Sequence, residues 1–267
     1  MSIFPVFTMD FDTLSNKLIE TIRNDFVNGS LTIAKNALRG LIEIVERAYP
    51  NDTNKLGRFV IELKKTKPAM SALQNVLERA LSAVSSGDRF ALILQLNKLL
   101  ELLEKSTNDA INIAKEYITQ NFTPPYRIVT ASFSSTFLKF AKELSQIEST
   151  EIFCLESKWA GQDYSVLLAE KLTQIGVVAK NLPMVAIGTI ANCSFAMIGA
   201  DCVSHSGVVN GVPSQNLALQ CNNHDVPLFV LAESIKYSRK CNPESGFDFI
   251  DSSLISKIFS DDIFENK

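Results

Sequence analysis

The second half of this chain consists of short apolar runs that alternate with helix-like segments. Each run is apolar throughout, which is typical of a strand covered on both faces of a sheet. The runs lie at 127–130, 151–155, 176–179, 195–198 and 227–231, and we expect the last of them to end the sheet. Helical spacing occupies the intervals at 135–144, 164–175 and 214–222. Strands that alternate with helices form right-handed parallel units, so the pattern predicts an α/β fold with a Rossmann-like parallel sheet.

The first half of the chain has almost no strand signal. Its apolar residues recur at spacings of three and four, which is the period of a helix with one buried face. Helices are expected at about 14–22, 33–45, 53–65, from Pro68 onward, and 88–119. Proline is tolerated in the first turn of a helix, so Pro68 fits the start of the fourth. Thr123-Pro124-Pro125 marks the change of character, which predicts a helical N-terminal domain over 1–122 and a Rossmann-like domain over 123–267.

Charge and composition disfavour several classes of function. The chain has 26 basic and 29 acidic residues, whereas nucleic-acid proteins usually carry a basic excess, so nucleic-acid binding is not expected. No apolar stretch reaches 18 residues and residues 1–12 lack the pattern of a signal peptide, so we expect a cytoplasmic protein without a membrane span.

The cysteines predict neither a disulfide framework nor a metal site. They are odd in number and contain no Cys-x-x-Cys pair, which favours reduced and mostly buried thiols. The five are Cys154, Cys193, Cys202, Cys221 and Cys241. No glycine-rich nucleotide motif is present either, so no cofactor is expected.

Polar residues follow the predicted strands, at the edge where ligands bind to open parallel sheets. They are Thr130, Ser132, Ser134, Ser135 and Thr136 after the first strand, Glu156 to Lys158 after the second, Asp201 and Asn210 after the fourth, and Glu233, Ser234 and Lys236 after the last. Hydroxyl and amide groups at a helix N-terminus suit a phosphate or carboxylate. A simpler interpretation stays open for each: the serines cap a helix, Asp201 is a turn residue, and Glu233 pairs with Lys236 at the surface.

Several ordered segments resemble one family. They are Ile198–Asp201, Gly207–Asn210, Asn216–Leu219, Val226–Val230 and Glu233–Tyr237, with weaker matches at Thr66–Asn75, Glu156–Lys158 and Phe247–Ile255. The chain resembles the family of the alpha, beta and delta regulatory subunits of translation initiation factor 2B. That family also includes methylthioribose-1-phosphate isomerase and ribose-1,5-bisphosphate isomerase.

The resemblance implies a helical domain on a Rossmann-like domain, with dimerisation through the latter. In the enzymes a cysteine and the aspartate of Gly-Ala-Asp convert an aldose phosphate to a ketose phosphate. Here Asp201 is retained, but Ser132 stands at the cysteine position. Lys67 and Lys158 replace arginines of the family motifs, which removes bidentate contact with phosphate. The family's usual strand and helix after Phe259 look missing or shortened.

The retained fold motifs and lost catalytic residues favour a non-catalytic, regulatory-subunit-like protein with a degenerate sugar-phosphate or nucleotide pocket. Its expected partner is a second copy of itself, with initiation factor 2 or a related subunit, and a phosphorylated small molecule, as further candidates. The expected ligand-binding residues are Ser134, Ser135, Lys158, Gln162, Asn210 and Lys236. The alternative is an isomerase with altered chemistry that uses Asp201 with Ser132 or Cys202.

Overall fold

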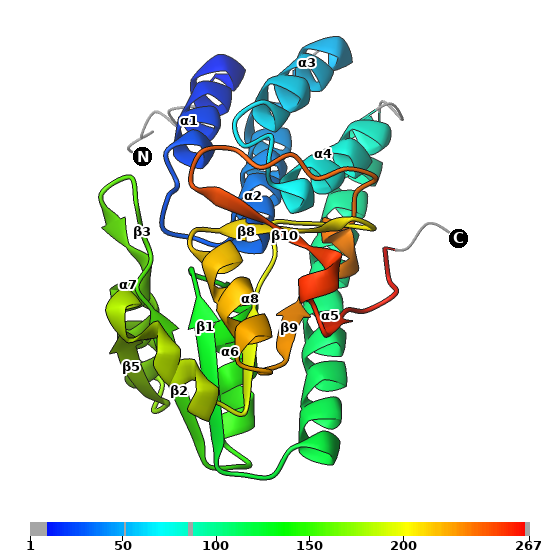
Figure 1. Cartoon of the computed structure of the whole chain (residues 1–267). Coiled ribbons are helices and arrows are strands. Elements are labelled where there is room, and N and C mark those ends of the chain that lie inside the picture. The colour runs from blue at the N-terminus through cyan, green and yellow to red at the C-terminus, as the bar shows by residue number, and fades with distance from the viewer. Residues whose placement is uncertain (1–9, 51, 85–87, 265–267) are drawn as a thin grey trace, which may run out of the picture.

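A layer of helices lies above a parallel sheet in the computed structural model, which describes residues 10–50, 52–84 and 88–264 (Figure 1). The N-terminal helices are α1 (Phe11–Arg23), α2 (Ser30–Ala48), α3 (Thr53–Lys64), α4 (Ser71–Val84) and α5 (Arg89–Asn121). The expectations that concerned residues 1–9, Asn51 and Gly87 lie outside the described residues.

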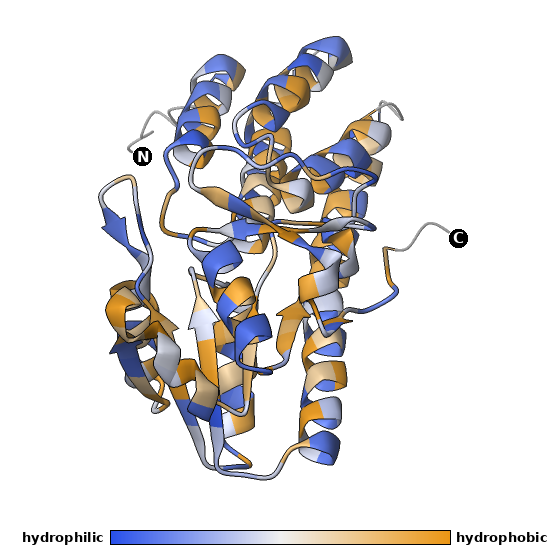
Figure 2. Ribbon diagram, in the orientation of Figure 1, coloured by the Kyte–Doolittle hydropathy of each residue, from blue (hydrophilic) through white to orange (hydrophobic). Residues whose placement is uncertain are grey.

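The N-terminal helices form because each has an apolar face, and three of them, α1, α3 and α5, begin with an aspartate cap. Asp10 accepts a hydrogen bond from the Thr13 amide, and Asp88 accepts from the amides of Phe90 and Ala91. Apolar and polar residues alternate along these helices (Figure 2). The fourth helix begins at Ser71 and not at Pro68, because residues 67–70 form a turn in which the Met70 amide donates to the Lys67 carbonyl.

The prediction of a parallel α/β sheet is confirmed. Six strands, all parallel to their neighbours, lie in the order β11-β9-β6-β1-β2-β5. Their bounds are β1 (Tyr126–Ala131), β2 (Thr150–Leu155), β5 (Val178–Leu182), β6 (Phe195–Ile198), β9 (Leu228–Leu231) and β11 (Lys257–Phe259). The third strand therefore starts two residues later than predicted and runs three residues further.

Helices cover both faces of this sheet, which explains why its strands are apolar throughout. The C-terminal part of α5 packs on one face with α6 (Ser135–Ser145) and α7 (Tyr164–Gln174). On the other face lie α8 (Ser214–Asn223) and the 3-10 helix η1 (Met184–Asn192). Consecutive residues of β1 point to opposite cores: Ile128 joins the α6 side and Val129 the α8 side. The N-terminal part of α5 packs in the helical core, so this helix links the two halves.

Two strands beyond the expected last one correct the sequence analysis. β10 (Phe247–Asp251) joins β8 (Gly207–Gly211) and β7 (Cys202–Ser204) in an antiparallel sheet between the helical layer and the main sheet. β11 extends the main sheet, so the C-terminal strand is short but present. A small hairpin of β3 (Lys158–Trp159) and β4 (Gln162–Asp163) also forms. These strands are two to five residues long, and runs of that length carry too little periodic signal.

The cysteine prediction was wrong in one respect. Cys202 and Cys241 form a disulfide with Cα atoms 5.7 Å apart, although 39 residues separate them in the chain. Only the tertiary fold brings them within disulfide range. Cys154, Cys193 and Cys221 are free, and burial raises the pKa of the Cys154 and Cys221 thiols to about 12.

Neither a membrane span nor a metal cluster is found over 10–50, 52–84 and 88–264. No helix there is long and apolar enough to cross a membrane. No three or more histidine, cysteine or acidic side chains gather there in a way that could hold a metal ion.

Candidate functional site

A cavity of about 290 Å³ lies where the helical layer meets the carboxyl edge of the main sheet. Ser132, which directly follows β1, and Asp201, which follows β6, both line it. The loop before α2 and the turn before α4 supply its other side. The fold thus brings together two of the predicted residues that come from separate strands, as expected of the carboxyl edge of a parallel sheet.

Ser132 adopts a backbone conformation that serine seldom takes. Its φ is 65°, in the left-handed region, which costs a non-glycine residue about 1 kcal/mol or more. Its side chain also lies tightly against Gly211, since a Cβ on that glycine would be 2.3 Å from Ser132 Oγ. A strained backbone and a glycine that makes room for one hydroxyl are features of a functional position.

Asp201 is held rigidly at the cavity by its backbone. Its amide donates to the Val209 carbonyl, and its carbonyl accepts from the Ser71 amide at 3.0 Å, which joins β8 to the start of α4. Burial raises the pKa of its carboxyl above the ordinary 3.8, although the Lys236 charge and a hydrogen bond from Ser30 oppose that shift. A carboxyl of this kind retains its proton at higher pH than an exposed one.

The raised pKa of Asp201 predicts how the stability of the chain depends on pH. The folded chain binds this proton more tightly than the unfolded chain, so ionisation of Asp201 lowers stability as pH rises from about 3.8 to the raised pKa. Asp201→Asn removes that loss. The free energy of unfolding, measured in urea from acid to neutral pH, should therefore rise for the variant relative to the wild type across this window. Above the window the difference should stay constant.

Asp251→Asn is the control with the opposite sign, because hydrogen bonds from Ser253 lower the pKa of Asp251. If the free energies of unfolding of Asp201→Asn and wild type differ by the same amount at every pH, the pKa of Asp201 is not raised.

The cavity also contains charged and aromatic residues that sequence analysis did not single out. They are Arg23, Asp25, Phe26, Trp159, Tyr164 and Glu244. Trp159 lies on the β3–β4 hairpin and the others come from loops or helix ends, so the place of each at the cavity depends on the tertiary fold. No local pattern in the sequence would have identified them.

Lys67 and Tyr164 both bind the loop between α1 and α2. Lys67 Nζ donates to the Asp25 carbonyl at 3.0 Å and lies 4.0 Å from the centroid of the Phe26 ring. Burial lowers the pKa of Lys67, against the opposing charges of Asp25 and Glu244. Tyr164 donates its hydroxyl to the Phe26 carbonyl at 2.8 Å. Burial, with smaller effects from the Asp201 and Asp25 charges, raises the pKa of Tyr164. Lys67 and the phenol of Tyr164 are therefore already engaged in holding the wall of this cavity.

Four of the predicted ligand-binding residues surround a smaller void next to Asp201. This void measures about 10 Å³, close to the minimum for one water molecule. The four are Ser134, Ser135, Asn210 and Lys236. Ser134 caps α6 by accepting from the Phe137 amide, as its simpler interpretation has it, and Asn210 Nδ2 donates to Ser214 Oγ. The void is too small for a sugar phosphate.

Lys158 and Gln162 lie elsewhere, on the β3–β4 hairpin. Lys158 is exposed and pairs with Glu156 at 2.7 Å and Asp163 at 3.6 Å. Gln162 donates to the Asp163 carbonyl. Neither is among the residues that line the two cavities.

Glu233 and Lys236 form a buried ion pair and not a surface pair. Lys236 Nζ lies 2.8 Å from Glu233 Oε2, and both side chains are almost fully covered. The other carboxylate oxygen accepts from the hydroxyls of Thr107 on α5 and Thr136 on α6. Burial alone would raise the pKa of Glu233, but the charge and hydrogen bond of Lys236, together with Thr136, lower it overall. The pair ties the segment after β9 to α5 and α6, which cover the same face of the sheet.

The chain is similar to proteins named for initiation factor 2B. The model of the Initiation factor 2 subunit family matches residues 26–258. A translation initiation factor eIF-2B subunit 2-like protein of Pyrococcus furiosus is 26% identical over 232 residues, which cover 84% of this chain and 79% of that protein. The ribose 1,5-bisphosphate isomerase of Methanocaldococcus jannaschii is 22% identical over 250 residues, or 88% of this chain and 77% of the isomerase.

Solved structures share the fold at low sequence identity. The translation initiation factor eIF-2B of Pyrococcus horikoshii OT3 superposes with a TM-score of 0.80 at 20% identity, covering 92% of this chain and 94% of that one. A chain of the tetrameric eIF2B-beta2-delta2 complex of C. thermophilum gives 0.75 at 16% identity, covering 94% and 90%. Because the family model spans most of its length, the chain belongs to the Initiation factor 2 subunit family.

Proposed function

We propose that this chain is a regulatory-subunit-like protein that acts by associating with other protein chains and not by catalysis. Its cavity is then a degenerate sugar-phosphate or nucleotide pocket that holds a small phosphorylated molecule weakly or not at all. Its partners are a second copy and, beyond that, initiation factor 2 or a related subunit. The division into domains at 122/123 is part of the same proposal.

The observation that carries this proposal is the lack of a usable thiol at the cavity. Ser132 presents a hydroxyl where the isomerase reaction uses a thiol, whose pKa is far lower. Cys202 directly follows Asp201, but its sulfur is bonded to Cys241. Among the described lining residues, no histidine or free cysteine lies at this cavity to activate the Ser132 hydroxyl. Asp201 is therefore left without the thiol partner that the isomerase reaction uses for proton transfer between adjacent sugar carbons.

The charges around the cavity also disfavour strong phosphate binding. Two cations, Arg23 and Lys67, face three acidic residues, Asp25, Asp201 and Glu244. A phosphate dianion is normally held by a local excess of positive charge or by bidentate arginine contacts. The balance here supports a pocket that has lost its original ligand.

Direct assay tests whether catalysis has been lost. We expect no turnover of ribose-1,5-bisphosphate or methylthioribose-1-phosphate by the purified full chain, measured by chromatographic separation of aldose and ketose phosphates. Asp201→Asn serves as the matched control, since any activity of the site would depend on that carboxyl. Turnover in the wild type that Asp201→Asn abolishes would overturn the non-catalytic proposal.

That outcome would favour the alternative, an isomerase with altered chemistry. The observation behind it is that Ser132 and Asp201 line one cavity and that Asp201 has a raised carboxyl pKa, as a general acid needs. The isomerase relative from Methanocaldococcus jannaschii is consistent with this alternative.

Association through the Rossmann-like half is the second testable part. The similar C. thermophilum structure is a tetrameric complex, which supports association as a mode of action. In this chain η1 packs against α8, and Val185 (98% exposed) and Leu219 (46% exposed) leave apolar surface over them. We propose that a second copy covers this surface.

Val185→Glu should therefore convert a dimer to a monomer at micromolar concentration, as measured by light scattering. A carboxylate placed in an apolar contact pays a desolvation penalty of several kcal/mol without a partner. Phe90→Glu is the matched control on the helical half, because Phe90 is also a highly exposed apolar residue (79%) but lies on α5. A monomeric wild type, or a dimer unaffected by Val185→Glu, would contradict the proposed interface.

A further inference from the structure

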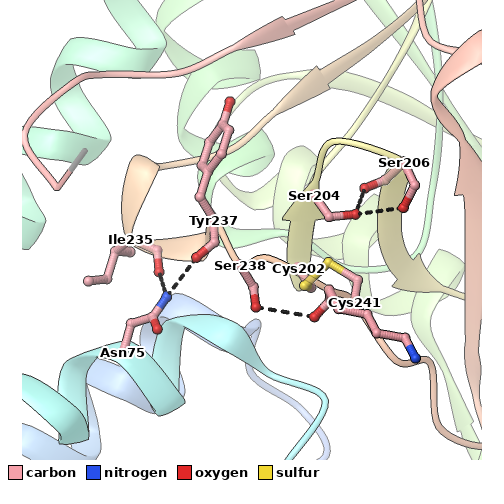
Figure 3. The surroundings of a disulfide bond; sticks show 10 residues. Asn75, Cys202, Ser204, Ser206, Ile235, Tyr237, Ser238 and Cys241 are labelled. Atoms are coloured by element: carbon pink, nitrogen blue, oxygen red, sulfur yellow. Dashed lines mark hydrogen bonds between the residues drawn. A yellow bond between two sulfur atoms is a disulfide. The ribbon is translucent and has the colours of Figure 1, made fainter. Parts of the chain in front are cut away.

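The disulfide between Cys202 and Cys241 joins the site to an irregular loop. Cys202 directly follows Asp201 at the start of β7, while Cys241 lies in residues 238–246, here called the Cys241 loop. Between Tyr237 and β10 this loop forms neither helix nor strand. Figure 3 shows the two sulfur atoms bonded between β7 and the loop.

The Cys241 loop is fixed at both ends. At its start, Asn75 of α4 donates to the carbonyls of Ile235 and Tyr237 (Figure 3). The Ser238 amide also donates to the Val203 carbonyl at 2.8 Å. At its end, the Gly246 carbonyl accepts from the Val212 amide at 3.0 Å. Hydrogen bonds therefore hold both ends of the loop.

The middle of the loop has one attachment, the disulfide. Cys241 is buried, whereas its neighbours on both sides are exposed: Arg239, Lys240, Asn242, Pro243, Glu244 and Ser245. Within the described part of the chain, no hydrogen bond joins residues 239–243 to a helix or strand. The Cys241 sulfur packs in a small core with Cys202 and Val209. Without the S–S bond, only that contact would hold the loop down.

The loop forms a wall of the large cavity. Glu244, Ser245 and Gly246 line it together with Asp201. Gly246 has φ 90° and lies directly against Trp159 on the β3–β4 hairpin, since a Cβ there would be 2.5 Å from the indole nitrogen. A change in the loop would thus be felt both at the cavity and at Trp159.

We propose that this disulfide is a redox-controlled clasp on the cavity. In the oxidised form it holds the Cys241 loop as a fixed wall beside Asp201, and its reduction by a dithiol protein or peptide releases the wall. The inference concerns access to the cavity and holds whether the site is catalytic or degenerate, so it goes beyond the proposed function.

The dithiol supplies the two electrons that reduction of the disulfide requires. A reductant thiolate attacks Cys241 Sγ, forms a mixed disulfide and displaces the Cys202 thiolate, which takes a proton from water. The second thiol of the reductant then attacks the mixed disulfide. The products are two cysteine thiols in this chain and a disulfide in the reductant, so two electrons pass from the dithiol. Cys241 is the more exposed of the two cysteines, at 7% against 2% for Cys202, and the nearby exposed Arg239 and Lys240 attract an anionic thiolate.

The test uses the only tryptophan of the chain, Trp159, as a reporter of the wall. Full-length oxidised protein is compared with protein reduced by excess dithiothreitol. We expect reduction to raise acrylamide quenching of Trp159, which is 40% exposed, by up to about twofold, because freeing the middle of the loop loosens the Gly246 backbone that packs on the indole. Hydrogen exchange should accelerate around Cys241, within residues 239–245, and stay unchanged in β1 and β2. Reoxidation should reverse both effects.

Two variants separate the clasp from general effects of reductant. Cys241→Ser should show the reduced behaviour at all times and ignore dithiothreitol. Cys193→Ser removes a free, partly exposed thiol and should respond as the wild type does. Denatured but unreduced wild type should titrate three thiols, namely Cys154, Cys193 and Cys221.

Three results would each overturn the inference. The first is five titratable thiols before reduction. The second is identical quenching and exchange in the oxidised and reduced forms. The third is loss of the far-ultraviolet circular dichroism signal on reduction, which would mean that the whole fold, and not the loop alone, requires the disulfide.

Discussion

Replacing Lys236 by methionine should lower the free energy of unfolding by about 3–5 kcal/mol, because it leaves the Glu233 carboxylate buried without its counter-charge. The two side chains lie 2.8 Å apart with almost no exposure to solvent. The hydrogen bonds from Thr107 and Thr136 remain, but neutral donors compensate a buried charge only in part. Urea unfolding at neutral pH measures the loss.

The pair should also show a defined pH dependence. In the wild type the pKa of Glu233 lies below its ordinary 4.5, so this stabilisation is present above that pH and is lost as pH falls through the folded value. In Lys236→Met the unopposed burial favours the protonated acid. The difference between the two proteins should therefore be largest near neutral pH and shrink below about 4.5.

Matched variants identify burial as the cause. Lys180→Met breaks the exposed pair with Glu151, and should cost less than about 1 kcal/mol. Glu233→Gln combined with Lys236→Met removes both charges and should regain much of the loss, because the two effects are strongly coupled. A loss in Lys236→Met no larger than in Lys180→Met would show that the pair is not buried as described.

The second large effect is expected at the end of the main sheet, where Phe259→Ala should cost about 3–5 kcal/mol of unfolding free energy. Phe259 lies on β11 and is fully buried. Its ring centroid is 5.3 Å from that of Phe229 and 5.2 Å from that of Tyr117. Truncation would leave a cavity between β9 and α5 that the surrounding rings cannot close.

Phe90→Ala is the control for this prediction, since Phe90 is 79% exposed and its truncation should change stability by less than about 0.5 kcal/mol. Both variants are measured by the same denaturant unfolding. A loss below about 1 kcal/mol in Phe259→Ala would mean that the C-terminal strand contributes little to the sheet.

The local pattern was sufficient for the fold class and for most elements. The period of apolar residues changes at Thr123-Pro124-Pro125, and the alternation beyond it follows from local chemistry, so the parallel sheet and its helices were predicted within a few residues. The resemblance to the family also rests on short motifs and their order along the chain, which the sequence alone contains. Short strands such as β7 and β11 were not predicted, because three residues are too few to show a periodic pattern.

The composition of the site depended on contacts between distant segments. Ser132 and Asp201 were predictable, since both follow strands of one sheet edge. Trp159 was not predictable, because a hairpin carries it to the wall formed by Gly246. That Glu233 and Lys236 are buried, and that α5 and α6 supply their partners, also came only with the fold.

The Ile198–Asp201 segment illustrates the division most clearly. Its residues alone indicated a strand followed by a carboxylate at a ligand-binding edge, since strand propensity and chain order are local properties. Whether a thiol lies beside that carboxylate depends on contacts between distant segments. The fold places Cys202 within reach of Cys241 across 39 residues and places Ser132 opposite Gly211, because tertiary packing sets distances that spacing along the chain does not contain.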